Sequence, residues 1–158
     1  MEDFGRKLQQ IRQKAIEERR HTEKHAWDRQ ELDRAQRVDE AASGIEAHIE
    51  SRLRQFMKQF TEFHFDAHVD RGRHLRVYWD DPTGGRARLY QLALRVRRYH
   101  EYADVEVDVK MIVANAEKPR YLREEDVLEG NVDLLEDFID QQICRFARLY
   151  SAERAFDD

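Results

Sequence analysis

The first third of the chain contains almost nothing that would interrupt a helix. Between Glu2 and Glu62 there is no proline, and the only glycines are Gly5 and Gly44. The other positions are rich in Arg, Lys, Glu, Gln and Ala, which are good helix formers. Oppositely charged side chains recur four residues apart, and each such pair supports a solvated helix by a few tenths of a kcal/mol. The stretch therefore predicts one long helix.

The apolar residues divide this helix into two parts. The C-terminal part carries large apolar side chains at intervals of three and four residues, a stripe wide enough to pack on a core. These are Val38, Ala42, Ile45, Ile49, Leu53, Phe56 and Phe60. The N-terminal part begins with the same interval at Phe4, Leu8 and Ile11, but residues 17–37 offer few apolar side chains: Ala26, Trp27, Leu32 and Ala35. A helix this polar is typical of a coiled-coil arm or of a segment that binds a partner.

The length of the helix has a consequence for its surroundings. A continuous helix over this span would be roughly 90 Å long at 1.5 Å per residue, which is more than one small domain can cover. The alternative is a break at Ser43-Gly44 that folds two shorter helices into one globule. Because a glycine inside a helix costs only about 1 kcal/mol, we expect a continuous helix. The predicted organisation is a projecting helical arm over residues 1–40 and a small α+β domain over residues 41–158.

At Phe63 the apolar residues begin to alternate with polar ones, which is typical of a half-buried strand. This alternation continues to Val69 and, after a turn at Gly72, resumes from Leu75 to Trp79. A second hairpin joins residues 88–98 to residues 103–113. One register of that hairpin pairs an apolar face and also pairs charges, as a stable sheet requires. In this register Leu92, Leu94 and Val96 lie opposite Met111, Val109 and Val107, Arg95 lies opposite Asp108, and Arg97 lies opposite Glu106.

A polar connector over residues 115–130, in which Pro119 blocks regular structure, leads to a final amphipathic helix from Val132 to Tyr150. The predicted fold class is therefore α+β. It consists of a long N-terminal amphipathic helix, a four-stranded antiparallel β-meander and a C-terminal helix packed on the same sheet face as the first helix. Cys144 is predicted to lie on the inward side of the last helix as an inert thiol.

Charge and cysteine content limit the classes of function. The formal net charge of −5 weighs against nucleic acid or a membrane as the main partner. A single cysteine excludes an intramolecular disulfide and suits a reducing compartment. We find neither a signal peptide nor an apolar run near the roughly 20 residues of a membrane span. These observations favour a cytoplasmic location.

The best metal-ligand candidates lie on the polar side of the first strand. His64, Asp66 and His68 are spaced by two residues, so their side chains share one side of a strand, and His74 lies across the turn. Imidazole and carboxylate groups suit zinc or another first-row ion. This pattern is the basis of an alternative hypothesis, a ligand- or metal-binding protein that could be enzymatic. We interpret the group as an exposed strand face that carries histidines.

An arginine-rich strand over residues 86–98 supports a further alternative. Arg86, Arg88, Arg95, Arg97 and Arg98 are interspersed with Tyr90 and Tyr99, a pattern found in proteins that bind single-stranded nucleic acid. However, two of these arginines are already matched by acidic residues on the next strand. We therefore regard nucleic-acid binding as the weaker hypothesis.

No catalytic or cofactor motif is present in the sequence, so we predict no cofactor and no enzymatic activity. The main hypothesis is a protein-interaction or assembly module that self-associates, or docks another chain, through its long N-terminal helix. We expect a homo-oligomer, with a dimer as the simplest form. The predicted interface residues are Phe4, Leu8, Ile11, Trp27 and Leu32.

Overall fold

A computed structural model describes residues 2–83, 87–124 and 131–155 of the chain. Side-chain placements are described for residues 3–22, 29–83, 87–116 and 132–155. The chain divides into two compact units, Met1–Gln36 and Arg37–Asp158. The described part of the first unit is helical throughout, and the second unit contains the sheet.

Helix α1 (Glu2–Gln59) continues through Ser43 and Gly44, so the expectation of an unbroken helix is confirmed. A Cβ atom built on Gly44 would meet nothing within 4 Å. This glycine is therefore not required by any close contact, and it costs the helix only its weak propensity. No helix within the described ranges has an apolar stretch of the length and character needed to cross a membrane.

The sheet is a five-stranded antiparallel meander in which each strand pairs with the next along the chain. Its strands are β1 (His64–Val69), β2 (Arg73–Asp81), β3 (Arg88–Tyr99), β4 (Asp104–Val113) and β5 (Ala116–Glu124). A short 3₁₀ helix, η2 (His100–Tyr102), joins β3 to β4. The predicted register of β3 and β4 is confirmed at every pair, from Leu92 opposite Met111 to Arg97 opposite Glu106.

The fifth strand differs from the irregular connector expected there. Ala114 and Asn115 both have positive φ, as in a type I′ hairpin turn, and this turn leads β4 directly into β5. Pro119 lies within β5 opposite Lys110. Because β5 is an edge strand, it has one neighbour only, and proline can be accommodated where its missing N–H faces away from the ladder. The other four strands form the predicted meander.

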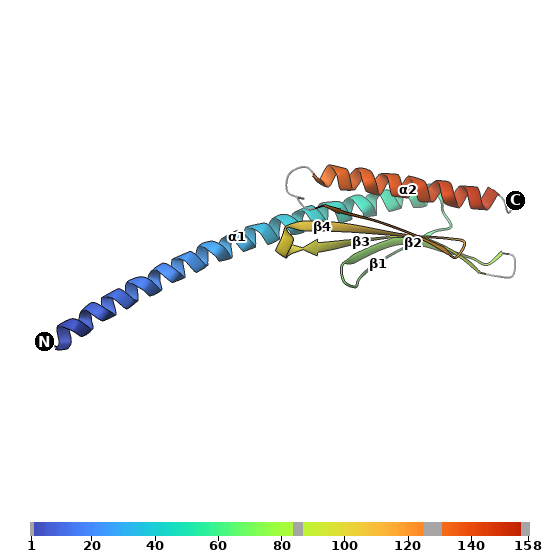
Figure 1. Cartoon of the computed structure of the whole chain (residues 1–158). Coiled ribbons are helices and arrows are strands. Elements are labelled where there is room, and N and C mark those ends of the chain that lie inside the picture. The colour runs from blue at the N-terminus through green and yellow to red at the C-terminus, as the bar shows by residue number, and fades with distance from the viewer. Residues whose placement is uncertain (1, 84–86, 125–130, 156–158) are drawn as a thin grey trace. The chain divides into compact units, whose positions relative to one another are not determined.

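Both long helices cover one face of the sheet, which confirms the α+β fold class (Figure 1). The C-terminal part of α1 and helix α2 (Asn131–Ala155) run side by side above the strands. The core lies between these two layers, and its side chains alternate along each strand. Its fully buried members include Ile45, Ile49 and Leu53 of α1, Leu92 and Leu94 of β3, and Leu135, Ile139 and Phe146 of α2. In the described chain the opposite sheet face carries no helix.

Candidate assembly surfaces

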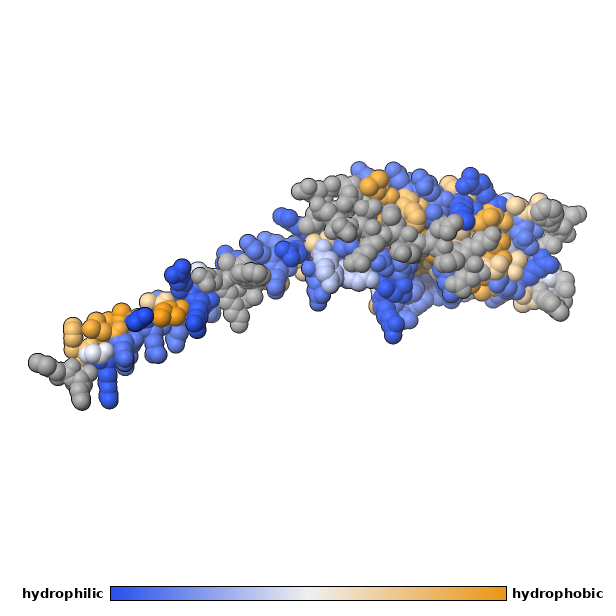
Figure 2. Space-filling model, in the orientation of Figure 1, coloured by the Kyte–Doolittle hydropathy of each residue, from blue (hydrophilic) through white to orange (hydrophobic). Residues whose placement is uncertain are grey.

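The N-terminal unit exposes large apolar side chains on its helix. Phe4, Leu8 and Ile11 are 70%, 53% and 66% exposed. Leu32 is also exposed, whereas the side chain of Trp27 lies outside the described residues. Figure 2 shows apolar surface gathered towards the N-terminal end of this unit. We call Phe4, Leu8 and Ile11 the N-terminal stripe.

Basic side chains border this stripe on both sides. Each residue of an α-helix is rotated by about 100° from the one before it. Lys7 and Lys14 therefore fall on one flank of the stripe, and Arg12 falls on the other. All three side chains are exposed, and within the described residues none has a carboxylate within ion-pair distance. The stripe is thus an apolar seam bordered by Lys7, Arg12 and Lys14, with Asp3 and Glu18 one helical turn from the two lysines.

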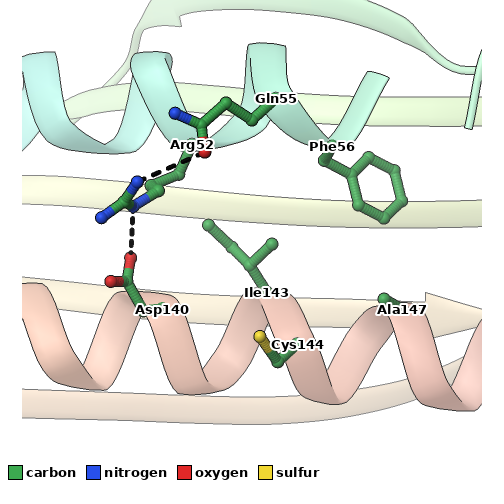
Figure 3. A pocket seen from close by; sticks show the side chains of 7 residues that line it. All are labelled: Arg52, Gln55, Phe56, Asp140, Ile143, Cys144 and Ala147. Carbon is green, nitrogen blue, oxygen red and sulfur yellow. Dashed lines mark hydrogen bonds and ion pairs between the residues drawn. The ribbon is translucent and has the colours of Figure 1, made fainter. Parts of the chain in front are cut away.

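A second candidate surface is a groove of about 360 Å³ between α1 and α2 in the sheet-containing unit. Figure 3 shows its walls, which combine apolar side chains with a polar end. We call it the interhelical groove, and it is lined by Arg52, Gln55 and Phe56 of α1 and by Asp140, Ile143, Cys144 and Ala147 of α2. Its volume lies at the lower end of the range of about 300–1,000 Å³ that is common for ligand pockets.

Ion pairs fix the polar end of the groove. The Nε of Arg52 donates to Oδ1 of Asp140 at 3.0 Å, and its Nη1 donates to Oε1 of Gln55 at 3.3 Å (Figure 3). The Nε2 of His48 lies 2.8 Å from the same Asp140 oxygen. These contacts join the two helices and hold the charged groups at one end. They leave Phe56, Ile143 and Ala147 as the apolar part of the groove.

Cys144 is exposed at the groove, so its predicted position on the inward side of α2 is wrong. The side of α2 that faces the core is formed by Leu135, Ile139, Gln142 and Phe146. Cys144 is two residues from Gln142 and Phe146, a rotation of about 200° in each case. It therefore lies away from the core and is available to a molecule that occupies the groove.

Acidic residues extend the groove along α2. Asp133, Glu136 and Asp137 precede Asp140 by seven, four and three residues, which places them on the same side of the helix. Asp133 and Asp137 are exposed, and Glu136 is half-buried. In the described part of the chain none of the three has an ion-pair partner. The groove is thus apolar at its centre and acidic along its continuation.

On the histidine-bearing face of the sheet, one arginine contacts several neighbouring side chains. Arg76 donates from Nε to Oδ2 of Asp66 at 3.0 Å and from Nη1 to Oε1 of Gln91 at 2.9 Å. Its guanidinium also lies 4.4 Å from the ring centroid of Tyr78. Asp66, one of the candidate metal ligands, is therefore already engaged by a cation.

The candidate histidines are only partly brought together. The rings of His68 and His74 stack at 4.5 Å across the β1–β2 pair, and Nε2 of His74 donates to the carbonyl oxygen of Asp70 at 2.7 Å. His64 lies instead beside the ring of Tyr78 at 5.7 Å. Within the described residues no group of three or more His, Cys, Asp or Glu side chains is arranged to hold a metal ion.

The arginines of β3 lie beside carboxylates. Arg95 pairs with Asp108, as predicted, and Nη1 of Arg97 lies 3.9 Å from Glu106. The remaining pairs link the strand to the helices. Arg98 lies 2.7 Å from Glu46 and 3.3 Å from Asp39, both on α1, and Arg88 lies 3.8 Å from Glu153 on α2. Arg86 falls outside the described residues.

A polar cluster at the end of β2 was not expected from the sequence. Asp81 is buried and pairs with Arg154 of α2, and the O–H of Tyr150 donates to Glu62. Burial, followed by the hydrogen bond to Glu62, raises the pKa of Tyr150. Asp81 continues the alternation of Leu75, Val77 and Trp79, and this pattern could have predicted that its side chain is buried. The alternation recognised in the sequence ends at Trp79, two residues short of the observed end of β2 at Asp81.

We compared the chain with protein-family models, with curated proteins and with solved structures, and none of the three comparisons gives a significant match.

Proposed function

We propose that this chain is a non-enzymatic assembly module that self-associates through the N-terminal stripe of α1. The observation that carries the proposal is the exposure of Phe4, Leu8 and Ile11 on a unit whose described part is helix alone. A single helix has no second layer on which to bury an apolar seam. Burying such a seam against another chain removes apolar surface from water, which is the main driving force of protein association.

The shape of the stripe supports a protein as its partner. Positions 4, 8 and 11 follow the alternating four- and three-residue interval of a coiled-coil seam, which is narrower than the face of a helix that packs on a globular core. Helix-in-groove recognition uses anchors at the same intervals. We place the partner-binding residues at Phe4, Leu8 and Ile11, with Trp27 and Leu32 as further contacts. A homo-oligomer, with a dimer as its simplest form, is the proposed state, and a cytoplasmic location remains a prediction from the sequence.

The contacts on the sheet give less support to the two alternatives. Nucleic-acid binding needs positive charge that is free to replace counterions on phosphates. Arg95, Arg97 and Arg98 each lie beside a carboxylate, so much of the charge of this strand is already compensated. A metal ion at Asp66 would compete with the cation of Arg76, which already forms an ion pair of 2.9 Å with Oδ2 of this carboxylate. Neither alternative rests on an exposed surface without contacts of its own that is comparable to the apolar stripe.

The experiment is the absolute molar mass of the full chain, measured by light scattering over a range of concentrations. The test variant is Leu8→Asp/Ile11→Asp, which places two carboxylates in the stripe. The matched control is Gln9→Asp/Gln13→Asp, which makes the same charge change at exposed positions away from the stripe. We expect the unaltered chain and the control to form the same oligomer and the test variant to be monomeric.

Two results would overturn the proposal. A monomeric unaltered chain at every concentration would exclude self-association. An oligomer that keeps its mass in Leu8→Asp/Ile11→Asp would show that assembly uses another surface. Circular dichroism of the two variants provides the folding control, because both pairs of substitutions lie at solvent-exposed helical positions and should leave the helix content unchanged.

A further inference from the structure

We propose that the N-terminal stripe of one copy docks into the interhelical groove of a second copy. This inference rests on the proposed function and adds the identity of the surface that receives the stripe. It makes assembly a contact between two different surfaces of the same chain. The stripe supplies apolar side chains with basic neighbours, and the groove supplies an apolar cavity that continues into an acidic segment of α2.

The apolar parts of the two surfaces complement each other. The groove has a volume of about 360 Å³ and opens to solvent over Phe56 and Ile143, which are only 6% and 8% exposed, and over the half-buried Ala147. The stripe presents side chains of the kind that such a groove can bury. A third helix laid along two parallel neighbours is a common way to cover an apolar seam between helices. This groove is an apolar cavity bounded by two helices.

The charges favour the groove over a parallel pair of stripes. If two stripes packed on each other, Lys7, Arg12 and Lys14 of one copy would lie beside the same basic side chains of the other. Basic side chains lie on both flanks of the stripe, so a parallel arrangement places like charges side by side, whereas an antiparallel one can also bring Asp3 opposite Lys14. Like charges that face each other across an interface are unfavourable and are a common means of excluding a wrong partner.

The acidic continuation of the groove has the opposite charge. Asp133, Glu136 and Asp137 lie on the groove side of α2 and have no ion-pair partner within the described residues. The lengths also correspond. Residues 4–14 span about 15 Å of helix, and residues 133–147 of α2 span about 21 Å, at a rise of 1.5 Å per residue. When the stripe occupies the groove, the basic side chain at its end, Lys14, can therefore reach the acidic segment.

A contact between two different surfaces has a consequence for assembly. When each of two copies places its stripe in the other's groove, the contact closes into a twofold dimer. When the exchange is not mutual, the same contact adds copies one after another. Both arrangements predict that each copy uses a stripe and a groove, and that single-surface variants can complement each other when they are mixed.

Cys144 provides a direct test because it lines the groove and is the only cysteine in the chain. A chain carrying Leu8→Cys and Cys144→Ser is mixed with the unaltered chain and oxidised with diamide. We expect a disulfide between residue 8 of one copy and residue 144 of the other, identified by mass spectrometry of the linked peptides. The matched control, Gln13→Cys with Cys144→Ser, places the thiol away from the stripe and should give at least tenfold less product. Equal yields from the two variants, or no product from either, would overturn the proposal.

Charge reversal separates this inference from the proposed function. Lys7→Glu/Lys14→Glu and Asp133→Lys/Asp137→Lys should each weaken self-association at least tenfold, and an equimolar mixture of the two variants should recover it. If Leu8→Asp/Ile11→Asp abolishes the oligomer but Asp133→Lys/Asp137→Lys leaves it unchanged, the stripe assembles on another surface. The inference then fails and the proposed function stands. If Leu8→Asp/Ile11→Asp has no effect, both fail.

Discussion

The carboxylate of Asp81, at the end of β2, forms an ion pair with the guanidinium of Arg154 on α2. The same carboxylate accepts hydrogen bonds from the backbone N–H of Thr83 at 2.9 Å and from its hydroxyl at 2.6 Å. Arg154 also lies over the ring of Trp79, 5.0 Å from its centroid. Asp81 is only 1% exposed, so these donors replace the water that it loses on folding. The contact ties the last turn of α2 to the end of the sheet.

Replacing Asp81 with Asn should therefore destabilise the protein. Asn keeps the size of the side chain but removes the charge that pairs with Arg154, and hydrogen bonds to charged groups contribute about 1.5–3 kcal/mol each. We expect Asp81→Asn to lower the free energy of unfolding by about 2–3 kcal/mol, measured by urea denaturation. The neighbouring Asp80→Asn is the control, because Asp80 is exposed and its replacement should change stability by no more than about 0.5 kcal/mol. Equal losses of stability at the two positions would contradict the stabilising role assigned to the Asp81–Arg154 ion pair.

The same residue should contribute to the pH dependence of stability. The pKa of Asp81 is lowered from its ordinary 3.8, chiefly by the hydrogen bond from the Thr83 hydroxyl and also by the Thr83 N–H and Arg154, while burial acts in the opposite direction. The unfolded chain therefore takes up a proton at higher pH than the folded chain does. The stabilisation is complete above the unfolded pKa and is lost as the pH falls through the folded pKa.

Urea denaturation from neutral pH down to about pH 2 measures this contribution. The difference in stability between the unaltered chain and Asp81→Asn should be constant near neutral pH and should shrink below about pH 4. The comparison isolates Asp81, because the other carboxylates titrate in both proteins. A difference that stays constant down to the lowest pH would show that the folded and unfolded pKa values of Asp81 are the same.

The parts of the fold that the sequence predicted are those where two requirements agree. In the β3–β4 hairpin, the apolar face and the Arg95–Asp108 and Arg97–Glu106 pairs favour the same register, and that register is the one observed. The C-terminal part of α1 has the same property, because its apolar interval and its helix-forming composition coincide. In each of these segments, the local sequence pattern and the contacts with the partner element favour the same structure.

The parts that the sequence did not predict depend on contacts with distant residues. Strand β5 is polar and contains Pro119, so only its pairing with β4 reveals it as a strand. The position of Asp81 is explained by Arg154, which is far away in the sequence. Cys144 directly follows the buried Ile143, and the rotation of about 100° between successive residues places its side chain away from the core and at the groove.

Two adjacent leucines of α2 test the orientation of this helix on the sheet. Leu135 is fully buried, whereas Leu134 is 55% exposed. Leu135→Ala should lower the free energy of unfolding by about 2–5 kcal/mol, because it removes buried methyl groups and leaves a cavity. Leu134→Ala makes the same chemical change on the exposed side and should cost no more than about 0.5 kcal/mol. A larger loss in Leu134→Ala than in Leu135→Ala would require a different rotation of α2.

Two glycines should respond to alanine in opposite directions. Gly72, in the β1–β2 turn, has a φ of +126°, and a Cβ atom there would lie 2.7 Å from the carbonyl oxygen of Val96. An L-residue rarely adopts this conformation, and such strain costs about 1–3 kcal/mol. Gly44 lies in a helix with open space around its Cβ position. Alanine has a higher helix propensity than glycine by about 1 kcal/mol.

We therefore expect Gly72→Ala to destabilise the protein by about 1–3 kcal/mol and Gly44→Ala to stabilise it by up to about 1 kcal/mol. Urea denaturation followed by circular dichroism measures both changes in the full chain. Each variant serves as the control for the other, since both add one methyl group in place of a hydrogen. Destabilisation by Gly44→Ala would mean that α1 is interrupted at Ser43-Gly44. If Gly72→Ala left the free energy of unfolding unchanged, the turn would relax away from Val96 without cost. The hairpin would then require neither the close approach nor the positive φ.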